Sequence, residues 1–351
     1  MITKNIIKQP KSIVEVTITA PWTDLAQTWD ATLQKMVSEV EIPGFRKGQA
    51  PLPMAEQNLG IKLQDEVLKA VMPNFLIEAL KGSDIIPIDY PKYDLISFVK
   101  GQQLQFKATI TNRPQITVGN YKTIKVTKPN PKQVTEDEVQ KVIDDLYKRW
   151  QTRTSVQGTG NSGQQTGSIS FQSNGQTKGP DDTFAKAMGV LSLIDLRSKI
   201  RKDLESNVSY NNELDYEEAI LQEVEKITTV ELPEILIQDE LNRMLVSLQR
   251  RVADMGLLLE DYLKTQGKTL EGIKSEWRVQ AEKNVRMELG LAEVARAENV
   301  TISDADLQAE VDKIQDAKIK AQFEAQEPRL HLRHALRQTR TLDLLKKMVG
   351  G

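Results

Sequence analysis

The sequence predicts two parts of different fold class, an α+β domain followed by an all-α helical body. Within the first 112 residues, apolar and polar side chains alternate in several short runs, which is the period of half-buried strands. From residue 181 onward, apolar residues instead recur every three or four positions, the spacing of amphipathic helices. Residues 155–180 separate the two regions, and there the composition shifts to Gly, Ser and Gln with Lys178 as the only charge.

The first 112 residues contain strands and helices in an order typical of one sheet with helices packed against it. We expect strands over residues 12–20, 93–99 and 104–110, the last two joined by a turn at Lys100-Gly101-Gln102. A second helical stretch covers residues 61–80, and Pro73 predicts a kink or a break within it. Thr23 is placed to cap the first helix, whose apolar face contains Trp22, Leu25, Trp29, Leu33, Val37 and Val40.

The connection to the helical body is predicted to be extended and then helical. Three prolines favour extended backbone over residues 113–133. Thr135 and Glu138 match a capping box, which predicts that a helix begins there and runs to about residue 154. Residues 155–180 have the composition of a flexible linker. Further helices are expected over residues 192–227, 233–255, 259–266, 270–298, 304–317 and 329–348.

The composition excludes several kinds of chemistry. The 47 basic and 49 acidic residues give a net charge of −2, so any contact with nucleic acid must be a local patch. Cysteine is absent, which excludes disulfides, thiol catalysis and cysteine-ligated metals. No apolar run approaches the roughly 18 residues that a membrane helix needs. The N-terminal residues also lack the pattern of a secretory signal, so we expect a cytoplasmic protein with no membrane partner.

The most informative short segment is Ile42-Pro43-Gly44-Phe45-Arg46-Lys47-Gly48-Gln49-Ala50-Pro51, between two amphipathic helices. Its glycines and prolines predict a tight tip that exposes Phe45, Arg46 and Lys47. The planar guanidinium of arginine can donate two parallel hydrogen bonds to a phosphate or a carboxylate. Lysine provides a compact positive charge, and phenylalanine provides an apolar contact surface. On chemistry alone, an ordinary turn with solvated charges explains these residues equally well.

The string G-F-R-K-G-x-x-P resembles the ribosome-docking signature of trigger factors, the chaperones at the exit of the ribosomal tunnel. Three further segments, residues 113–121, 181–186 and 263–269, are similar to that family's connector, the entry to its helical body and a junction within it. The resemblance implies that Gly44, Phe45, Arg46, Lys47 and Gly48 bind the large ribosomal subunit through ribosomal protein and rRNA.

The same resemblance implies a division of the chain into four parts. Residues 1–112 are the expected ribosome-binding domain and residues 113–154 the connector strand and helix. Residues 155–180 stand where the family carries an isomerase domain similar to FKBP, of which only Thr166–Phe171 resembles the opening strand. Residues 181–351 are expected to form a helical, SurA-like body with arms. We therefore expect a chaperone without prolyl isomerase activity.

The expected partners are nascent and unfolded polypeptides, and the resemblance leaves open a homodimer off the ribosome. Five apolar residues of one helix are the candidates for client contact, although most apolar stripes of this kind only pack helix against helix: Leu241, Met244, Leu245, Leu248 and Met255. Two rival functions remain, a peptidyl-prolyl isomerase and a ribosome-independent or periplasmic holdase.

Other motifs predict little. Gly158–Gly163 satisfies the G-x-G-x-x-G pattern, but no strand precedes it and no helix follows it directly, so dinucleotide binding is not expected. His331 and His334 lie three residues apart on a predicted helix without a third ligand nearby, which favours a solvated helix face over a metal site. No cofactor is expected.

Overall fold

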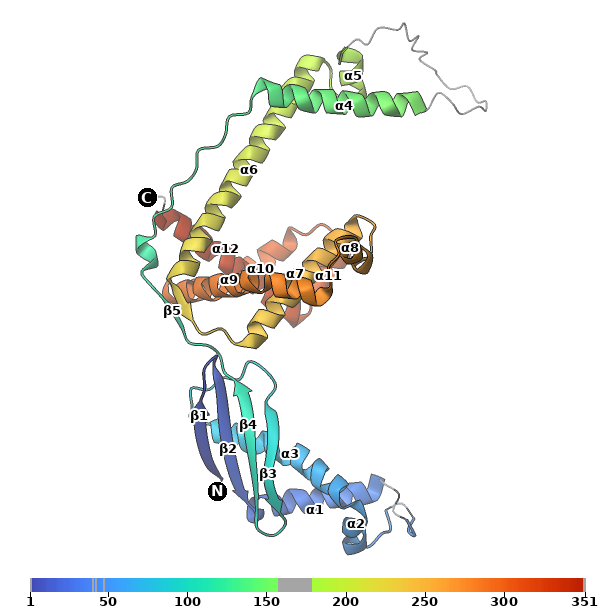
Figure 1. The fold of residues 1–351 in the computed structure, drawn as a ribbon, viewed down its shortest axis with the longest axis vertical. Coiled ribbons are helices and arrows are strands. Elements are labelled where there is room, and N and C mark those ends of the chain that lie inside the picture. Colours follow the sequence, from blue (N-terminus) through green and yellow to red (C-terminus); the bar gives the residue numbers. More distant parts are fainter. Residues whose placement is uncertain (1, 40, 42, 47, 157–178, 350–351) are drawn as a thin grey trace, which may run out of the picture. The chain divides into compact units, whose positions relative to one another are not determined.

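A computed structural model describes residues 2–39, 41, 43–46, 48–156 and 179–349 (Figure 1). The chain folds into two compact units, each built from two separate stretches. The first unit contains Met1–Tyr121 with Val224–Thr301, and the second contains Lys122–Glu223 with Ile302–Gly351. The N-terminal part is α+β and the remainder is mainly helical, which confirms the predicted fold class. The predicted four-part division by function stays a prediction.

A four-stranded antiparallel sheet forms one layer of the N-terminal domain. Its strands lie in the order β1 (Thr3–Lys8), β2 (Ile13–Pro21), β4 (Gln103–Thr111), β3 (Lys92–Val99). In β2 and β4 every second side chain is buried, so the alternation read from the sequence is confirmed for both strands. Strand β1 was not predicted, because its two apolar residues, Ile6 and Ile7, are adjacent and therefore show no alternation, and only Ile6 packs against the core.

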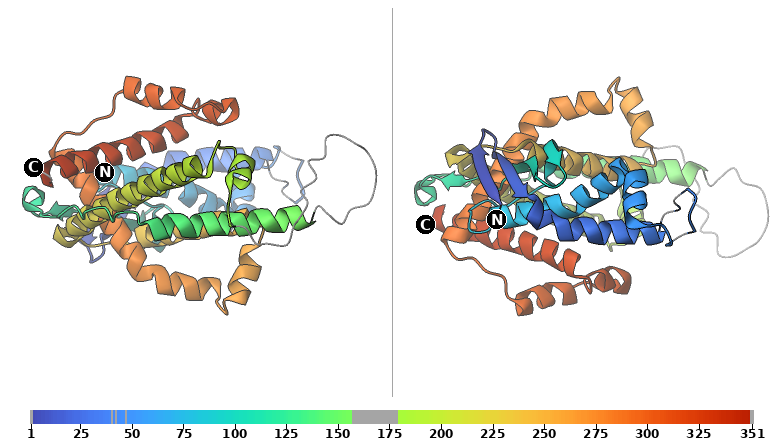
Figure 2. Two further views of the ribbon diagram at one scale, coloured as in Figure 1. Left: turned by 90° about the horizontal axis from the view of Figure 1, so that it is seen from above. Right: turned by 90° about the horizontal axis from the view of Figure 1, so that it is seen from below.

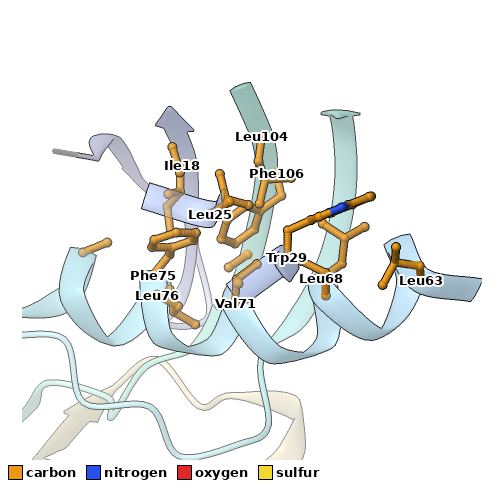
Figure 3. Close-up of a cluster of buried hydrophobic side chains, with 14 of the residues drawn as sticks. Ile18, Leu25, Trp29, Leu63, Leu68, Val71, Phe75, Leu76, Leu104 and Phe106 are labelled. Atoms are coloured by element: carbon orange, nitrogen blue, oxygen red, sulfur yellow. The ribbon is translucent and has the colours of Figure 1, made fainter. Parts of the chain in front are cut away.

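Three helices complete this domain: α1 (Trp22–Glu39), α2 (Leu52–Leu59) and α3 (Ile61–Leu80). Figure 3 shows side chains of α1 and α3 meeting those of β2 and β4 in one apolar cluster, with Leu25, Phe75 and Phe106 among them. Trp29 stacks on Phe98 of β3 with ring centroids 5.7 Å apart. Short α2 was not predicted.

Two local expectations for these helices need correction. Helix α1 begins at Trp22, so Thr23 lies inside the first turn and donates its hydroxyl to Asp24 at 3.2 Å instead of capping. Helix α3 runs through Pro73, so the predicted break is absent, whereas the predicted kink stays a prediction. A proline removes one backbone hydrogen bond, and burial of Val71 and Phe75 on either side compensates for that loss. Val40 lies outside the described residues.

The connector after the sheet contains one short strand, β5 (Ile116–Val118), followed by a 3₁₀ turn, η1 (Tyr121–Thr123). Strand β5 pairs antiparallel with β6 (Thr228–Val230). The extended conformation expected for the connector is therefore present in β5. Strand β6 was not predicted, since its three residues follow a long helix directly.

Three helices of the first unit form a helical hairpin: α7 (Glu234–Asp254), α8 (Leu259–Thr265) and α9 (Leu270–Ala297) (Figure 2). All three were predicted within a few residues of these bounds. Two small apolar clusters hold the hairpin together, one around Leu241 and Ala281 and the other around Leu248 and Val252. We call these three helices the α7–α9 hairpin below.

The second unit contains α4 (Glu136–Val156), α5 (Asp182–Ala187), most of α6 (Leu193–Ile227), α10 (Asp304–Asp312), α11 (Ala317–Gln322) and α12 (Gln326–Val349). The predicted capping box is confirmed, because the Thr135 amide donates to Glu138 Oε2 at 3.0 Å and the Glu138 amide to Thr135 Oγ1 at 3.3 Å. Figure 2 shows α12 alongside α10. The helix expected over residues 304–317 ends at Asp312, and α11 was not predicted.

Most of the segment with linker composition lies outside the described residues, as do Ser168–Phe171 and the Gly158–Gly163 pattern. Helix α4 continues to Val156, so the first two residues of the predicted linker are helical. Among the helices that the structure describes, none combines the length and apolar character needed to cross a membrane.

Candidate functional site

The loop between α1 and α2 carries the signature segment, and two glycines shape it. Gly44 has φ +85° and Gly48 φ +79°, a region of backbone conformation that favours glycine. The Gly48 amide donates to the Val37 carbonyl of α1 at 3.1 Å, and the Gln49 amide donates to the Arg46 carbonyl at 2.9 Å. The first bond joins the base of the loop to α1 and the second closes a turn within the loop, so the loop has an anchored base and an exposed tip.

The described side chains of this tip are accessible to a partner. Phe45 is 37% exposed and Arg46 is also exposed. Within the residues that the structure describes, the Arg46 guanidinium forms no hydrogen bond or ion pair, so its donors are free for a phosphate or a carboxylate. Gly44 and Gly48 are exposed as well, whereas Lys47 lies outside the described residues.

Two residues missed in the sequence extend this surface. Leu52 is 42% and Met54 56% exposed, and both lie on α2 directly after the loop. Ala55 and Leu59 of α2 are buried, so α2 packs against the domain while Leu52 and Met54 in its first turn remain exposed. The sequence signal for this feature was the short apolar run Leu52-Pro53-Met54-Ala55, whose length is too small for a helical period to be recognised.

The five candidate client-contact residues of α7 separate into three groups. Leu241 and Leu248 are buried in the two clusters of the α7–α9 hairpin, so in this conformation they are core residues and cannot contact a client. Met244 and Leu245 are half-buried at the edges of the same clusters. Met255, at the end of α7, is 60% exposed.

A groove of about 540 Å³ lies between α7 and α9 and includes Met244. Its remaining lining residues are Glu240, Arg243, Ser247, Arg251 and Trp277. Glu240 is buried, and its carboxylate accepts from Asn284 at 2.7 Å and from Arg243 at 2.9 Å. Arg243 also contacts Glu288 at 2.9 Å. The groove therefore combines an apolar part with a network of paired charges.

Another ion pair links the start of α7 to α9. Arg278 donates two hydrogen bonds to Glu234, at 2.7 and 2.6 Å, in the bidentate geometry that guanidinium and carboxylate favour. Hydrogen bonds from Arg278 and Gln238 lower the pKa of the Glu234 carboxyl to about 2. Glu234 is therefore ionised at neutral pH, and the pair fixes the two helices at this end of the hairpin.

A metal site is not formed by the residues that the structure describes, where no three His, Asp or Glu side chains are grouped suitably. The His331 side chain is 79% exposed and lies 3.9 Å from Glu327. Its position agrees with the solvated helix face that the sequence favoured.

Comparisons with known proteins agree with this architecture. The family model of the bacterial trigger factor protein matches residues 2–146, and the model of the trigger factor C-terminus matches residues 192–347. A trigger factor of Macrococcus caseolyticus is 28% identical, with 86% of this chain and 88% of the relative covered. A trigger factor of Clostridium botulinum (strain Eklund 17B) is 27% identical, with 80% and 84% covered.

A solved structure has the same fold. It comes from work on promiscuous substrate recognition in the folding and assembly activities of the trigger factor chaperone. Its TM-score is 0.61 at 18% sequence identity, with 99% of this chain and all of that chain covered. Both family models and these relatives agree on the N-terminal and C-terminal parts, so the chain belongs to the bacterial trigger factor family.

Proposed function

We propose that this protein docks on the large ribosomal subunit at the tunnel exit and shields nascent polypeptides without using ATP. The observation that carries the docking proposal is the exposed, anchored tip with free Arg46 donors, in the sequence context of the family's signature. Arg46 and Lys47 supply charges for rRNA phosphates. Phe45, Leu52 and Met54 supply apolar surface for a ribosomal protein. Such a complex forms in the cytoplasm, where ribosomes are.

Client shielding needs apolar contacts that are dispersed and release easily. The junction of α7 and α8 offers them, because Met255, Leu257 and Leu258 are all exposed there. Weak contacts of this kind let a client leave by competition with its own folding, so no nucleotide is required for release.

We also propose that the chain has no prolyl isomerase activity. The two family models leave residues 147–191 unmatched. The alignment with the Macrococcus caseolyticus relative runs over 375 residues, more than this chain contains, so part of that relative has no counterpart here. An isomerase pocket needs a closed apolar cavity, and the 26 residues from 155 to 180 contain only one aromatic side chain, Phe171.

Ribosome co-sedimentation tests the docking proposal. The variant Phe45→Ala/Arg46→Ala/Lys47→Ala removes the apolar plug and both charges from the exposed tip. The matched control is Tyr90→Ala/Lys81→Ala/Lys92→Ala, which removes one exposed aromatic and two exposed cations from another surface of the same domain. Both changes lie at the surface, where substitutions usually alter the free energy of unfolding by no more than about 0.5 kcal/mol.

We expect the loop variant to lose co-sedimentation and the control to keep it. If Arg46 and Lys47 each contact one rRNA phosphate, the affinity of the wild type for ribosomes should fall about tenfold between 50 and 200 mM salt. The loop variant should still suppress aggregation of an unfolded protein, since clients are bound elsewhere. Unchanged co-sedimentation of the loop variant, or equal loss in the control, would refute docking through this tip.

A peptide assay separates the chaperone proposal from the isomerase alternative. Uncatalysed cis–trans exchange of an X-Pro bond takes tens to hundreds of seconds at 25 °C. We expect the full chain to leave that rate unchanged on a short proline peptide. Clear acceleration, retained after residues 157–179 are deleted, would show an unrelated catalytic site and contradict the proposal.

A further inference from the structure

Helix α2, which directly follows the loop with the Gly44–Gly48 tip, has few contacts that fix its position. It is eight residues long, and only Ala55 and Leu59 are buried. Its N-cap residue, Pro51, makes no side-chain capping hydrogen bond. A helix of this length is not stable by itself. The contacts of α2 with the rest of the domain therefore decide where it lies.

One ion pair joins α2 to the sheet. The Lys100 ammonium donates a hydrogen bond to the Glu56 carboxylate of α2. The side chains of Gln57 and Asn58, the other polar residues of α2, have no hydrogen-bond partner within the part of the chain that the structure describes. The Lys100 side chain is 50% and the Glu56 side chain 27% exposed, so the pair is partly shielded from water.

Lys100 is itself held in place by the turn between β3 and β4. The Gln102 amide donates to the Val99 carbonyl at 3.0 Å, and the Trp22 amide of α1 donates to the Gln102 carbonyl at 2.9 Å. The Lys100 ammonium also lies 5.4 Å from the ring centroid of Trp29, within the range of a cation–π interaction. Because Trp29 is only 6% exposed, its ring is a fixed surface for the ammonium. Lys100 thus joins α1, α2 and the sheet.

We propose that Lys100 is a positioning residue for ribosome docking, which holds α2 and the adjoining loop in the conformation that binds. The inference rests on the proposed docking function and adds a residue outside the signature segment. The loop is then fixed at both ends, by the bond from the Gly48 amide to Val37 of α1 and by the ion pair with Glu56 of α2. The exposed apolar residues in the first turn of α2 are held by the same ion pair.

A direct contact between Lys100 and rRNA is a different role. Lysine binds phosphate as a compact charge, but here its ammonium is already paired with Glu56 and lies against Trp29. The two roles predict opposite effects of Glu56→Gln. If Lys100 binds phosphate, this change releases the ammonium and strengthens ribosome binding. If Lys100 positions α2, the same change loosens α2 and weakens ribosome binding.

The experiment measures two quantities on the full chain: hydrogen exchange of the α2 amides in the free protein, and ribosome affinity by co-sedimentation titration. Lys100→Met removes the charge and keeps a long apolar side chain, whereas Lys100→Arg keeps the charge. Glu56→Gln removes the ion pair from the other side. The matched controls are Lys92→Met and Glu78→Gln, which make the same chemical changes at exposed residues of the same domain.

We expect Lys100→Met and Glu56→Gln to speed exchange of the α2 amides and to weaken ribosome binding. Each effect should be about two- to fivefold, the range for one partly exposed ion pair. Lys100→Arg should restore both quantities, because arginine also pairs with a carboxylate and stacks on an aromatic ring. Both controls should exchange and bind like the wild type.

Salt dependence separates positioning from phosphate contact. If Lys100 binds a phosphate, the ratio of wild-type to Lys100→Met affinity should fall about threefold between 50 and 200 mM salt. Loss of positioning lowers only the fraction of molecules that are competent to bind. In that case the ratio should change by less than about twofold, through screening of the ion pair.

Several outcomes would contradict the positioning role. Unchanged or tighter ribosome binding by Glu56→Gln overturns it, and so does weaker binding by Lys100→Met without faster exchange in α2. Equal weakening in Lys92→Met shows a general charge effect. If exchange becomes faster while affinity is unchanged, the ion pair only stabilises α2, and the docking proposal still stands. The docking proposal itself fails if the variant Phe45→Ala/Arg46→Ala/Lys47→Ala binds ribosomes like the wild type.

Discussion

The substitution Gly290→Ala tests how closely α9 packs against the end of α6 and the start of β6. A Cβ atom added at Gly290 would lie 3.1 Å from Val224 Cγ1 and 3.3 Å from Thr228 Cβ, and less than 3.0 Å from Thr228 Oγ1. Thr228 cannot easily move, because it is only 5% exposed and its hydroxyl donates to the Val224 carbonyl at 2.6 Å. Strand β6, which contains Thr228, is also paired with β5.

Two opposing effects set the size of the change in stability. Overpacking a dense interior costs about 1–3 kcal/mol, and the site of Gly290 is at the severe end of that range. Alanine gains about 1 kcal/mol over glycine in a helix interior. We therefore expect Gly290→Ala to lower the free energy of unfolding by about 1–2 kcal/mol, measured by urea unfolding with circular dichroism.

A double mutant separates the contact from any general effect of alanine. In the Thr228→Ala background the nearest oxygen is gone, so the cost of Gly290→Ala should fall by about 1 kcal/mol or more. The reasoning is refuted if Gly290→Ala is as stable as the wild type. It is equally refuted if the substitution costs the same in both backgrounds.

Three further changes test other parts of the fold. Thr135→Ala should lower stability by about 1 kcal/mol through loss of the capping box, seen as a lower Tm that Thr135→Ser largely restores. Glu234 has a folded pKa of about 2, below its ordinary 4.5. Its contribution is therefore complete above about pH 5 and is lost as pH falls towards 2; Glu234→Gln should flatten this acid decline. Because Glu234 is nearly half exposed, the decline should not exceed about 1 kcal/mol. Asn212→Ala removes the 2.7 Å bond to the Pro129 carbonyl, so hydrogen exchange of residues 124–131 should become faster.

Helices and strands could be predicted from the sequence where a periodic apolar pattern continues over many residues or where a local capping motif is present. Strands β2 and β4 bury every second residue over nine positions, and α6, α7 and α9 each show several turns of one apolar stripe. The capping box at Thr135 was predictable because both of its bonds join residues three apart. Such signals depend on neighbours in the sequence and on nothing else in the fold.

Short elements could not be predicted, since their stability comes from distant partners. Strands β5 and β6 have three residues each and exist because they pair with one another across more than a hundred positions. Helices α2 and α11 have eight and six residues, too few for a helical period to be distinguished from chance. The break predicted at Pro73 is absent for a related reason, because burial on α3 outweighs the single backbone hydrogen bond that proline removes.

The same reasoning explains why the exposure of the Gly44–Gly48 loop was easier to predict than the exposure of individual residues on the apolar stripe of α7. Glycines, prolines, a cation and an aromatic in one loop indicate exposure directly, and Phe45 and Arg46 are exposed. The apolar stripe of α7 carries no such information. A stripe at i, i+3 and i+4 looks alike whether another helix or a client covers it.

Only the position of α9 decides which side of the α7 stripe is covered. Leu241 and Leu248 lie under α9 and its neighbours, so they stabilise the hairpin. Met244 lies between them on the same stripe, yet it is half-buried and lines the groove with Trp277. The sequence alone cannot assign such a residue to the core or to the surface, because one side of its side chain packs in the core while the other lines the groove.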